Sequence, residues 1–227
     1  NPYIEPEFTH AVEAGYQKYF KQSVFSTTLY HRVTTNEISR VRTTVGLVSE
    51  VRMVNLNSET ESGLEATLKL DPAKWWRQTL SGNAYYQQID GSNFDASFER
   101  GAFTYDAKWN STFLFTKSTS LQANASYRSR NVAPQGVILP MYWLDLSLRK
   151  DLWKQKATLT LGLSDVFDTR RFRVETNTVG VIQNWERKRE SRILTAGFTY
   201  KFGKQFGQQP RKRGHERSDE FGGGGDE

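Results

Sequence analysis

Strict alternation of apolar and polar residues near the C-terminus constrains the fold of this chain most strongly. The segment RILTAGFTYKFG, Arg192 to Gly203, has apolar side chains at every second position: Leu194, Ala196, Phe198, Tyr200 and Phe202. A repeat of two residues is that of a β-strand with one apolar and one mostly polar face. A strand of roughly ten residues that closes on aromatic side chains suits the thickness of a bilayer and its aromatic belt. The segment therefore predicts a transmembrane strand.

The same alternation recurs along the chain and predicts about nine strands. The segments are 8–20, 24–32, 64–70, 80–86, 103–113, 121–128, 144–149, 158–164 and 192–203. The fold class we expect is all-β: an antiparallel, up-and-down transmembrane β-barrel segment. Single-chain bacterial barrels have an even number of strands, so an odd number indicates an open half-barrel, with no ladder between segments 8–20 and 192–202.

The connections between these segments alternate in length. Short turns are expected near residues 21–23, 71–75, 116–119 and 151–156, and long loops near 42–58, 90–98, 130–141 and 169–191. Antiparallel strands visit the two ends of a barrel in turn, so the short turns share one end and the long loops share the other. Outer-membrane barrels have short periplasmic turns and long extracellular loops. This pattern predicts an outer-membrane protein with its long loops outside the cell and its C-terminus in the periplasm.

Aromatic residues gather at the short-turn end, where Trp75, Trp76 and Trp153 are candidate residues of the membrane interface. The alternative is a water-soluble barrel with its apolar face inward. That interior would have to hold Tyr105, Trp109, Phe113 and several more rings together, so we favour outer-membrane lipid as the partner of the apolar face.

The residues between the apolar positions would then face the lumen. The charged candidates for this face are Glu13, Glu65, Asp106, Lys108, Arg128, Asp145 and Arg149. We expect them to be solvated or paired against a plug, and contact between any single one and a substrate is the less favoured interpretation.

Composition and motifs argue against several other functions. The net charge is +6, but acidic residues accompany the basic ones and no basic stripe is interleaved with aromatics, so nucleic acid is not an expected partner. Cysteine is absent and the three histidines are far apart. Asp90, Asn93 and Asp95 lack the spacing of a calcium loop. We expect no catalytic residues, no metal and no cofactor, and we expect Asp165 and Asp168 to shape a strand end.

The domain organisation we expect is the C-terminal part of a transmembrane β-barrel, residues 1–204, followed by a disordered polar periplasmic tail, residues 205–227. The chain begins at Asn1 without a signal peptide, so we expect it to be processed or part of a longer protein.

Several segments resemble one family in the same order. They are NPYIEPEFTHAVEAGYQKYF, SGLEATL followed by two tryptophans, YWLDLSLRKDLWKQKATLTLGLSDVFDTRRF and GFTYKFGK. Together they resemble TonB-dependent outer-membrane receptors, in particular the barrel family of Bacteroidetes-type bacteria. The resemblance extends from the first residue to Lys204.

The resemblance implies a barrel of about 22 strands filled by an N-terminal plug. It also implies uptake of a bound siderophore, vitamin or glycan, powered by TonB through the plug. This chain has no plug and no segment for TonB contact, so the expected partners are the plug and the remaining strands of the same protein. The alternative that stays open is a non-transporting outer-membrane barrel that serves as an adhesin, an assembly factor or a scaffold.

Overall fold

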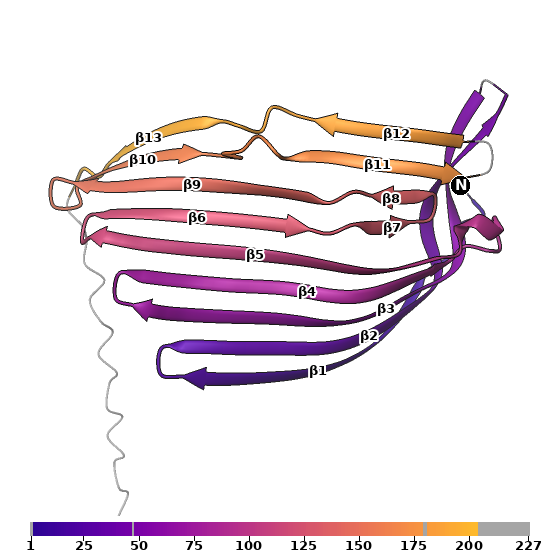
Figure 1. The fold of residues 1–227 in the computed structure, drawn as a ribbon, viewed down its shortest axis with the longest axis horizontal. Coiled ribbons are helices and arrows are strands. Elements are labelled where there is room, and N and C mark those ends of the chain that lie inside the picture. The colour runs from indigo at the N-terminus through magenta and orange to yellow at the C-terminus, as the bar shows by residue number, and fades with distance from the viewer. Residues whose placement is uncertain (1, 47, 179–180, 204–227) are drawn as a thin grey trace, which may run out of the picture.

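The structure is a computed structural model that describes residues 2–46, 48–178 and 181–203. Its described part is all-β, with thirteen strands and one short 3-10 helix (Figure 1). No helix within these residues is long and apolar enough to cross a membrane. The expectation of an all-β, antiparallel fold is confirmed.

Nine strands form the main sheet, as expected from the sequence, in the order β1-β2-β3-β4-β5-β6-β9-β10-β13. Their bounds are β1 (Phe8–Phe20), β2 (Ser23–Val45), β3 (Val48–Ala73), β4 (Trp76–Asp90), β5 (Arg100–Thr116), β6 (Thr119–Arg128), β9 (Met141–Leu152), β10 (Ala157–Leu163) and β13 (Leu194–Tyr200). Among the described residues β1 pairs only with β2, and β13 pairs only with β10. The sheet is therefore open, which confirms the expected lack of a ladder between its two edges.

The pairing register gives the sheet one apolar and one polar face. In one row across the strands Phe25 lies opposite Leu68, Leu68 opposite Leu80, and Leu80 opposite Trp109. The next row holds Ser26, Thr67, Ser81, Lys108 and Ser126. Because side chains alternate along every strand, a register that matches one apolar row matches them all.

The short turns all lie at one end of the sheet (Figure 1). Three of the four expected long loops, however, contain paired strands, and for these segments the prediction of a loop was wrong. β2 and β3 continue as a paired hairpin as far as Val45 and Val48, through the segment 42–58 that was expected to be a loop.

The other long connections also contain strands or a helical turn. Segment 130–141 holds β7 (Asn131–Ala133) and β8 (Gly136–Ile138), and segment 169–191 holds β11 (Arg171–Thr178) and β12 (Val181–Lys188). These four strands form a second sheet in the order β12-β11-β8-β7. The connection after β4 contains the 3-10 helix η1 (Ala96–Phe98).

A hydrophobic core explains why these connections fold. Val41, Leu56, Ile89 and Phe98 are each at most 3% exposed and pack together, with Val54 and Val132 against them. Burying apolar surface stabilises the structure by roughly 25 cal/mol per Å². We use the name loop module for three parts together: the second sheet, η1, and the outer part of the β2–β3 hairpin, which is residues 36–45 of β2 and 48–57 of β3.

The final strand is shorter than expected. β13 ends at Tyr200, so Phe202 lies just beyond it, although the Lys201 amide still donates to the Lys156 carbonyl at 2.8 Å. The predicted tail, residues 205–227, lies outside the described residues.

Candidate functional site

The seven charged residues predicted to face a lumen all lie on the polar face of the sheet. The register places Asn83 opposite Glu65, Asp106 opposite Asn83, and Arg128 opposite Asp106. Farther along the same face Asp145 lies opposite Asn124, and Arg149 lies opposite Thr160. Glu13 lies opposite Tyr30 near the β1 edge.

Three of the seven meet in one cavity of about 300 Å³: Asp106, Lys108 and Arg128. The cavity lies where the polar face meets the loop module, because Asn131 from β7 and Phe172 from β11 also line it. None of these three charges takes part in an ion pair within the described residues. The cavity therefore presents charged groups that a further polar partner could bind.

Three others among the seven are bound to neighbours. Glu13 forms an ion pair of 2.7 Å with Arg32, and Arg149 forms one of 3.0 Å with Asp151. The Asp145 carboxylate accepts a hydrogen bond of 2.8 Å from the Asp165 amide. Because these side chains are bound to their neighbours, we assign the three residues a structural role.

The polar face also carries packed aromatic residues that sequence reasoning did not single out. Tyr30 is 3% exposed, and its hydroxyl donates to Asn83 Oδ1 at 3.1 Å. Its ring covers Gly63, where an added Cβ would lie 2.7 Å from Tyr30 Cζ and 2.5 Å from Tyr85 Cβ. Only glycine fits at position 63, and this tight spacing in a strand signals close approach.

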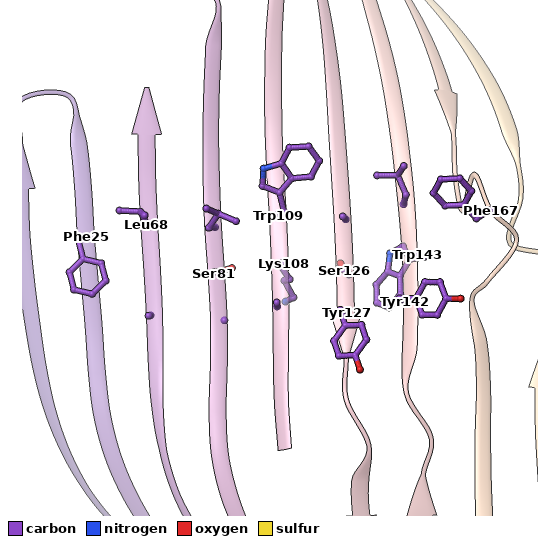
Figure 2. A pocket seen from close by; sticks show the side chains of 16 residues that line it. Phe25, Leu68, Ser81, Lys108, Trp109, Ser126, Tyr127, Tyr142, Trp143 and Phe167 are labelled. Atoms are coloured by element: carbon purple, nitrogen blue, oxygen red, sulfur yellow. The ribbon is translucent and has the colours of Figure 1, made fainter. Parts of the chain in front are cut away.

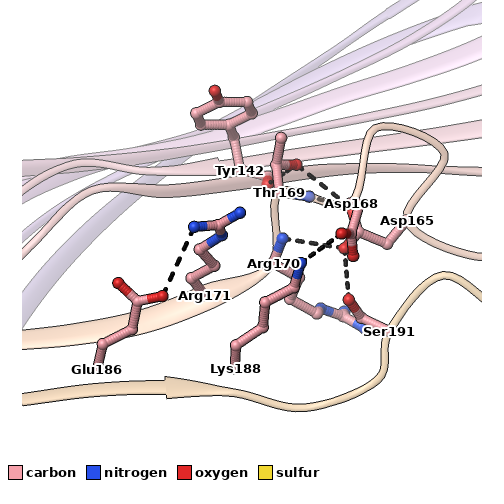
Figure 3. A network of polar contacts seen from close by, with 9 residues as sticks. All are labelled: Tyr142, Asp165, Asp168, Thr169, Arg170, Arg171, Glu186, Lys188 and Ser191. Carbon is pink, nitrogen blue, oxygen red and sulfur yellow. Dashed lines mark hydrogen bonds and ion pairs between the residues drawn. The ribbon is translucent and has the colours of Figure 1, made fainter.

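Asp165 organises the point where the chain leaves the main sheet for the β11–β12 hairpin (Figure 3). It is fully buried, and its carboxylate accepts hydrogen bonds from the Thr169 amide and hydroxyl, the Arg170 amide and the Ser191 hydroxyl. Ser191 follows β12, so one carboxylate holds the entry and the exit of the hairpin together. Nearby, Asp168 forms an ion pair with Lys188. The geometry agrees with the expectation that both aspartates shape a strand end.

The aromatic candidates form two clusters at the short-turn end. Trp75, Trp76 and Phe113 stack with ring centroids 6.0–6.4 Å apart. Trp153 makes edge contacts with Phe198 and Tyr200, at 6.3 and 6.0 Å. The placement at one end of the sheet is as predicted, and contact with a membrane interface stays a prediction.

The apolar face is hollowed where small side chains lie in a row. Ala66, Gly82 and Ala107 are direct neighbours on three successive strands. They floor a recess of about 850 Å³ whose walls include Phe25, Trp109 and Tyr142 (Figure 2). Two indole N–H groups of this face bond to neighbours: Trp109 donates to Gln78 at 3.1 Å and Trp76 to Ser111 at 2.8 Å. In the hydrocarbon core of a membrane no water can bond to a polar group, so each such group needs a hydrogen-bonding partner within the protein.

Comparison with known proteins identifies the family of this chain. The model of an outer membrane protein beta-barrel family matches residues 1–200. Comparisons with curated proteins and with solved structures gave no match. The family match covers every strand of the main sheet and agrees with its apolar and polar faces. The chain therefore belongs to the outer membrane protein beta-barrel family, whose members reside in the outer membrane.

Proposed function

We propose that this chain forms part of the barrel wall of a TonB-dependent outer-membrane receptor, which takes up a bound siderophore, vitamin or glycan. The observation that carries the proposal is the open nine-stranded sheet, whose edges β1 and β13 are each paired on one side only among the described residues. A barrel that contains this sheet needs further strands. Barrel diameter grows with strand number, and the widest outer-membrane transporters have a plugged lumen.

In this proposal the polar face lines the lumen and contacts a plug from the same protein. The charges of Asp106, Lys108 and Arg128 support this role, because they line a cavity without forming ion pairs with one another. Asp106 is half-buried, and Lys108 and Arg128 are exposed on this face. A polar plug surface that covered them would have to supply their partners, because charges that become buried need them. TonB would then act through the plug. We propose no enzymatic role.

In the orientation we propose, the apolar face contacts lipid, the loop module lies outside the cell, and the short turns and the C-terminal tail lie in the periplasm. The short turns support this orientation, because outer-membrane barrels have short periplasmic turns and longer extracellular connections. The aromatic clusters at the same end support contact with a bilayer interface, which Trp and Tyr favour.

A non-transporting barrel, such as an adhesin or a scaffold, is the second candidate. The loop module favours it, because its second sheet, joined through Val132 to a core shared with β2, β3, β4 and η1, presents a rigid surface of the kind that binds another molecule. The two candidates differ in what fills the lumen.

Adjacent residues on opposite faces allow a direct test, since the chain has no cysteine. A photo-crosslinker would be attached to Ser126→Cys, on the polar face beside Lys108, in the full protein in native outer membranes. We expect it to capture a plug segment of the same polypeptide, identified by mass spectrometry. The matched control, Ala125→Cys on the apolar face, should capture lipid.

An empty lumen would contradict the proposal. In that case Ser126→Cys would react freely with a water-soluble maleimide, yield no crosslinked plug peptide, and favour the non-transporting barrel. Dependence of uptake on TonB would be measured in parallel with a TonB-depleted strain.

A further inference from the structure

A second cleft lies between two hairpins of the loop module. It has a volume of about 320 Å³ and is lined by the tip of the β2–β3 hairpin and by β11 and β12. The lining side chains with polar or aromatic groups are Arg40, Arg42, Gln135, Thr176, Gln183 and Trp185. The volume is at the low end of the roughly 300–1,000 Å³ typical of small-molecule sites.

Gln135 holds the two walls of the cleft in place. Its Oε1 accepts a hydrogen bond of 2.7 Å from the Arg42 amide, and its Nε2 donates one of 2.6 Å to the Arg42 carbonyl. This paired contact joins the connection between β7 and β8 to the edge of the β2–β3 hairpin. The cleft is therefore built by specific contacts between separate hairpins.

The cleft is rich in donors and poor in acceptors. Arg42 Nη1 donates to Gln183 Oε1 at 3.2 Å, which occupies the acceptor of Gln183 and leaves its amide N–H groups. Arg40 forms no ion pair within the described residues, and no acidic side chain lines the cleft. Two guanidinium groups beside amide donors favour an oxyanion, and above all a carboxylate, because the guanidinium fork matches its two oxygens.

An aromatic side chain in the wall of the cleft favours a ligand with a flat surface. Trp185 is 44% exposed, and Phe172 fixes its orientation through an edge contact, with ring centroids 5.6 Å apart and an interplanar angle of 78°. Val174, directly opposite Trp185 in the β11–β12 ladder, adds apolar surface to the same wall. An indole held in this way offers a flat surface on which a ring can stack.

We propose that this cleft binds a ring compound that carries a carboxylate, with the carboxylate at Arg40 and Arg42 and the ring against Trp185. Both sugar acids and aromatic acids have this chemistry. The proposal names a ligand class for the receptor proposed above. It rests on that function only in treating the ligand as the substrate that is taken up, because binding to the cleft is measured separately from uptake.

Binding to the full protein in detergent micelles would be measured by saturation-transfer NMR with glucuronate, benzoate and glucose. We expect glucuronate or benzoate to bind, and neutral glucose to bind at least roughly tenfold more weakly, as loss of a charge-assisted hydrogen bond implies. The acid that binds more tightly shows whether the ligand is a sugar acid or an aromatic acid.

Three variants locate the site. Arg40→Gln should weaken binding of the acid roughly tenfold, and Trp185→Ala roughly two- to tenfold. Arg52→Gln removes the same charge from the same hairpin outside the cleft and should leave binding unchanged. Heat-modifiable migration in gels verifies that each variant is folded.

Three results would overturn the proposal: equal binding of glucose, no binding of either acid, or equal weakening by Arg52→Gln. None of these three results would contradict the proposed function as a TonB-dependent receptor. Conversely, selective binding of an acid together with an empty lumen in the crosslinking experiment would retain the cleft and reject TonB-dependent uptake.

Discussion

Asp165 is the residue whose replacement should most disturb the loop module. Its carboxylate accepts four hydrogen bonds in a fully buried position, and Asn at this site would keep its shape but lose the charge and an acceptor. The backbone φ of +43° is one that Asn also tolerates. We expect Asp165→Asn to destabilise the β11–β12 hairpin by roughly 2–3 kcal/mol. Hydrogen exchange of peptides from residues 171–188 measures this loss.

Asp168 supplies the matched control three residues away. Asp168→Asn removes a partly exposed ion pair with Lys188, which should cost less than about 1 kcal/mol. Equal loss of protection in the two variants would show that the buried carboxylate has no special role.

Glu37 predicts a pH dependence of the loop module. Burial, a hydrogen bond with Glu59 and the charges of Glu59, Glu7 and Glu61 raise the pKa of Glu37 from 4.5 to about 8. The folded state thus holds this proton more tightly than the unfolded state. The resulting stability is fully present below pH 4.5 and is lost as the pH rises towards about 8. Protection factors of residues 37–57, in which hydrogen exchange is corrected for the intrinsic pH dependence of amide exchange, should therefore be higher at acidic pH than near pH 8.

Glu37→Gln should flatten this dependence, because the amide keeps a hydrogen-bonding group without a titrating proton. Glu50→Gln removes an exposed carboxylate from the same hairpin and should leave the slope as it is. An unchanged slope in Glu37→Gln would assign the pH dependence to another group.

At the scale of the strand, the two faces predict unequal tolerance of charge. Leu146 lies on the apolar face of β9, opposite Ala123 and Leu163, whereas Ser147 lies on the polar face, opposite Gln122 and Gly162. Leu146→Arg should destabilise the inserted barrel by roughly 2–4 kcal/mol near the midplane, and Ser147→Arg by less. The folded fraction in heat-modified gels compares the two. Equal loss would reject the assignment of the faces.

The sequence predicted the strands of the main sheet well, because alternation marks each strand and fixes its faces together. Segment 103–113, for example, alternates throughout and lies within β5 (Arg100–Thr116). The loop module was missed because its strands are short or mixed in pattern. Phe172, Val174 and Thr176 do alternate, yet the charged residues around them hid the signal.

The candidate site was predictable only in part, for a related reason. Alternation indicated that Asp106, Lys108 and Arg128 share a face. Their meeting with Asn131 and Phe172 depends on where the β7–β8 and β11–β12 hairpins lie. The β7–β8 hairpin is held by Gln135, which bonds the backbone of Arg42, 93 residues away in the chain. Long-range contacts of this kind leave no local pattern.

At the scale of the whole molecule, the open edges predict which strands cannot be joined. Ala196→Cys on β13 should form a disulfide with Leu161→Cys, its direct neighbour on β10, upon oxidation in native membranes. Ala196→Cys combined with Val12→Cys, Ala14→Cys or Tyr16→Cys on β1 should not. Gel migration with and without reductant reads out each pair. A disulfide between β1 and β13 would indicate a small closed barrel and favour the non-transporting candidate.

The core of the loop module also has a consequence for assembly. Val41, Leu56, Ile89, Phe98 and Val132 come from β2, β3, β4, η1 and β7, so the chain must be laid down from its first hairpin to beyond β6 before the core can close. Once it closes, withdrawal of any one of these strands requires the whole cluster to open. The core thus links five elements, so that none of them can leave the structure without exposing apolar surface of the other four.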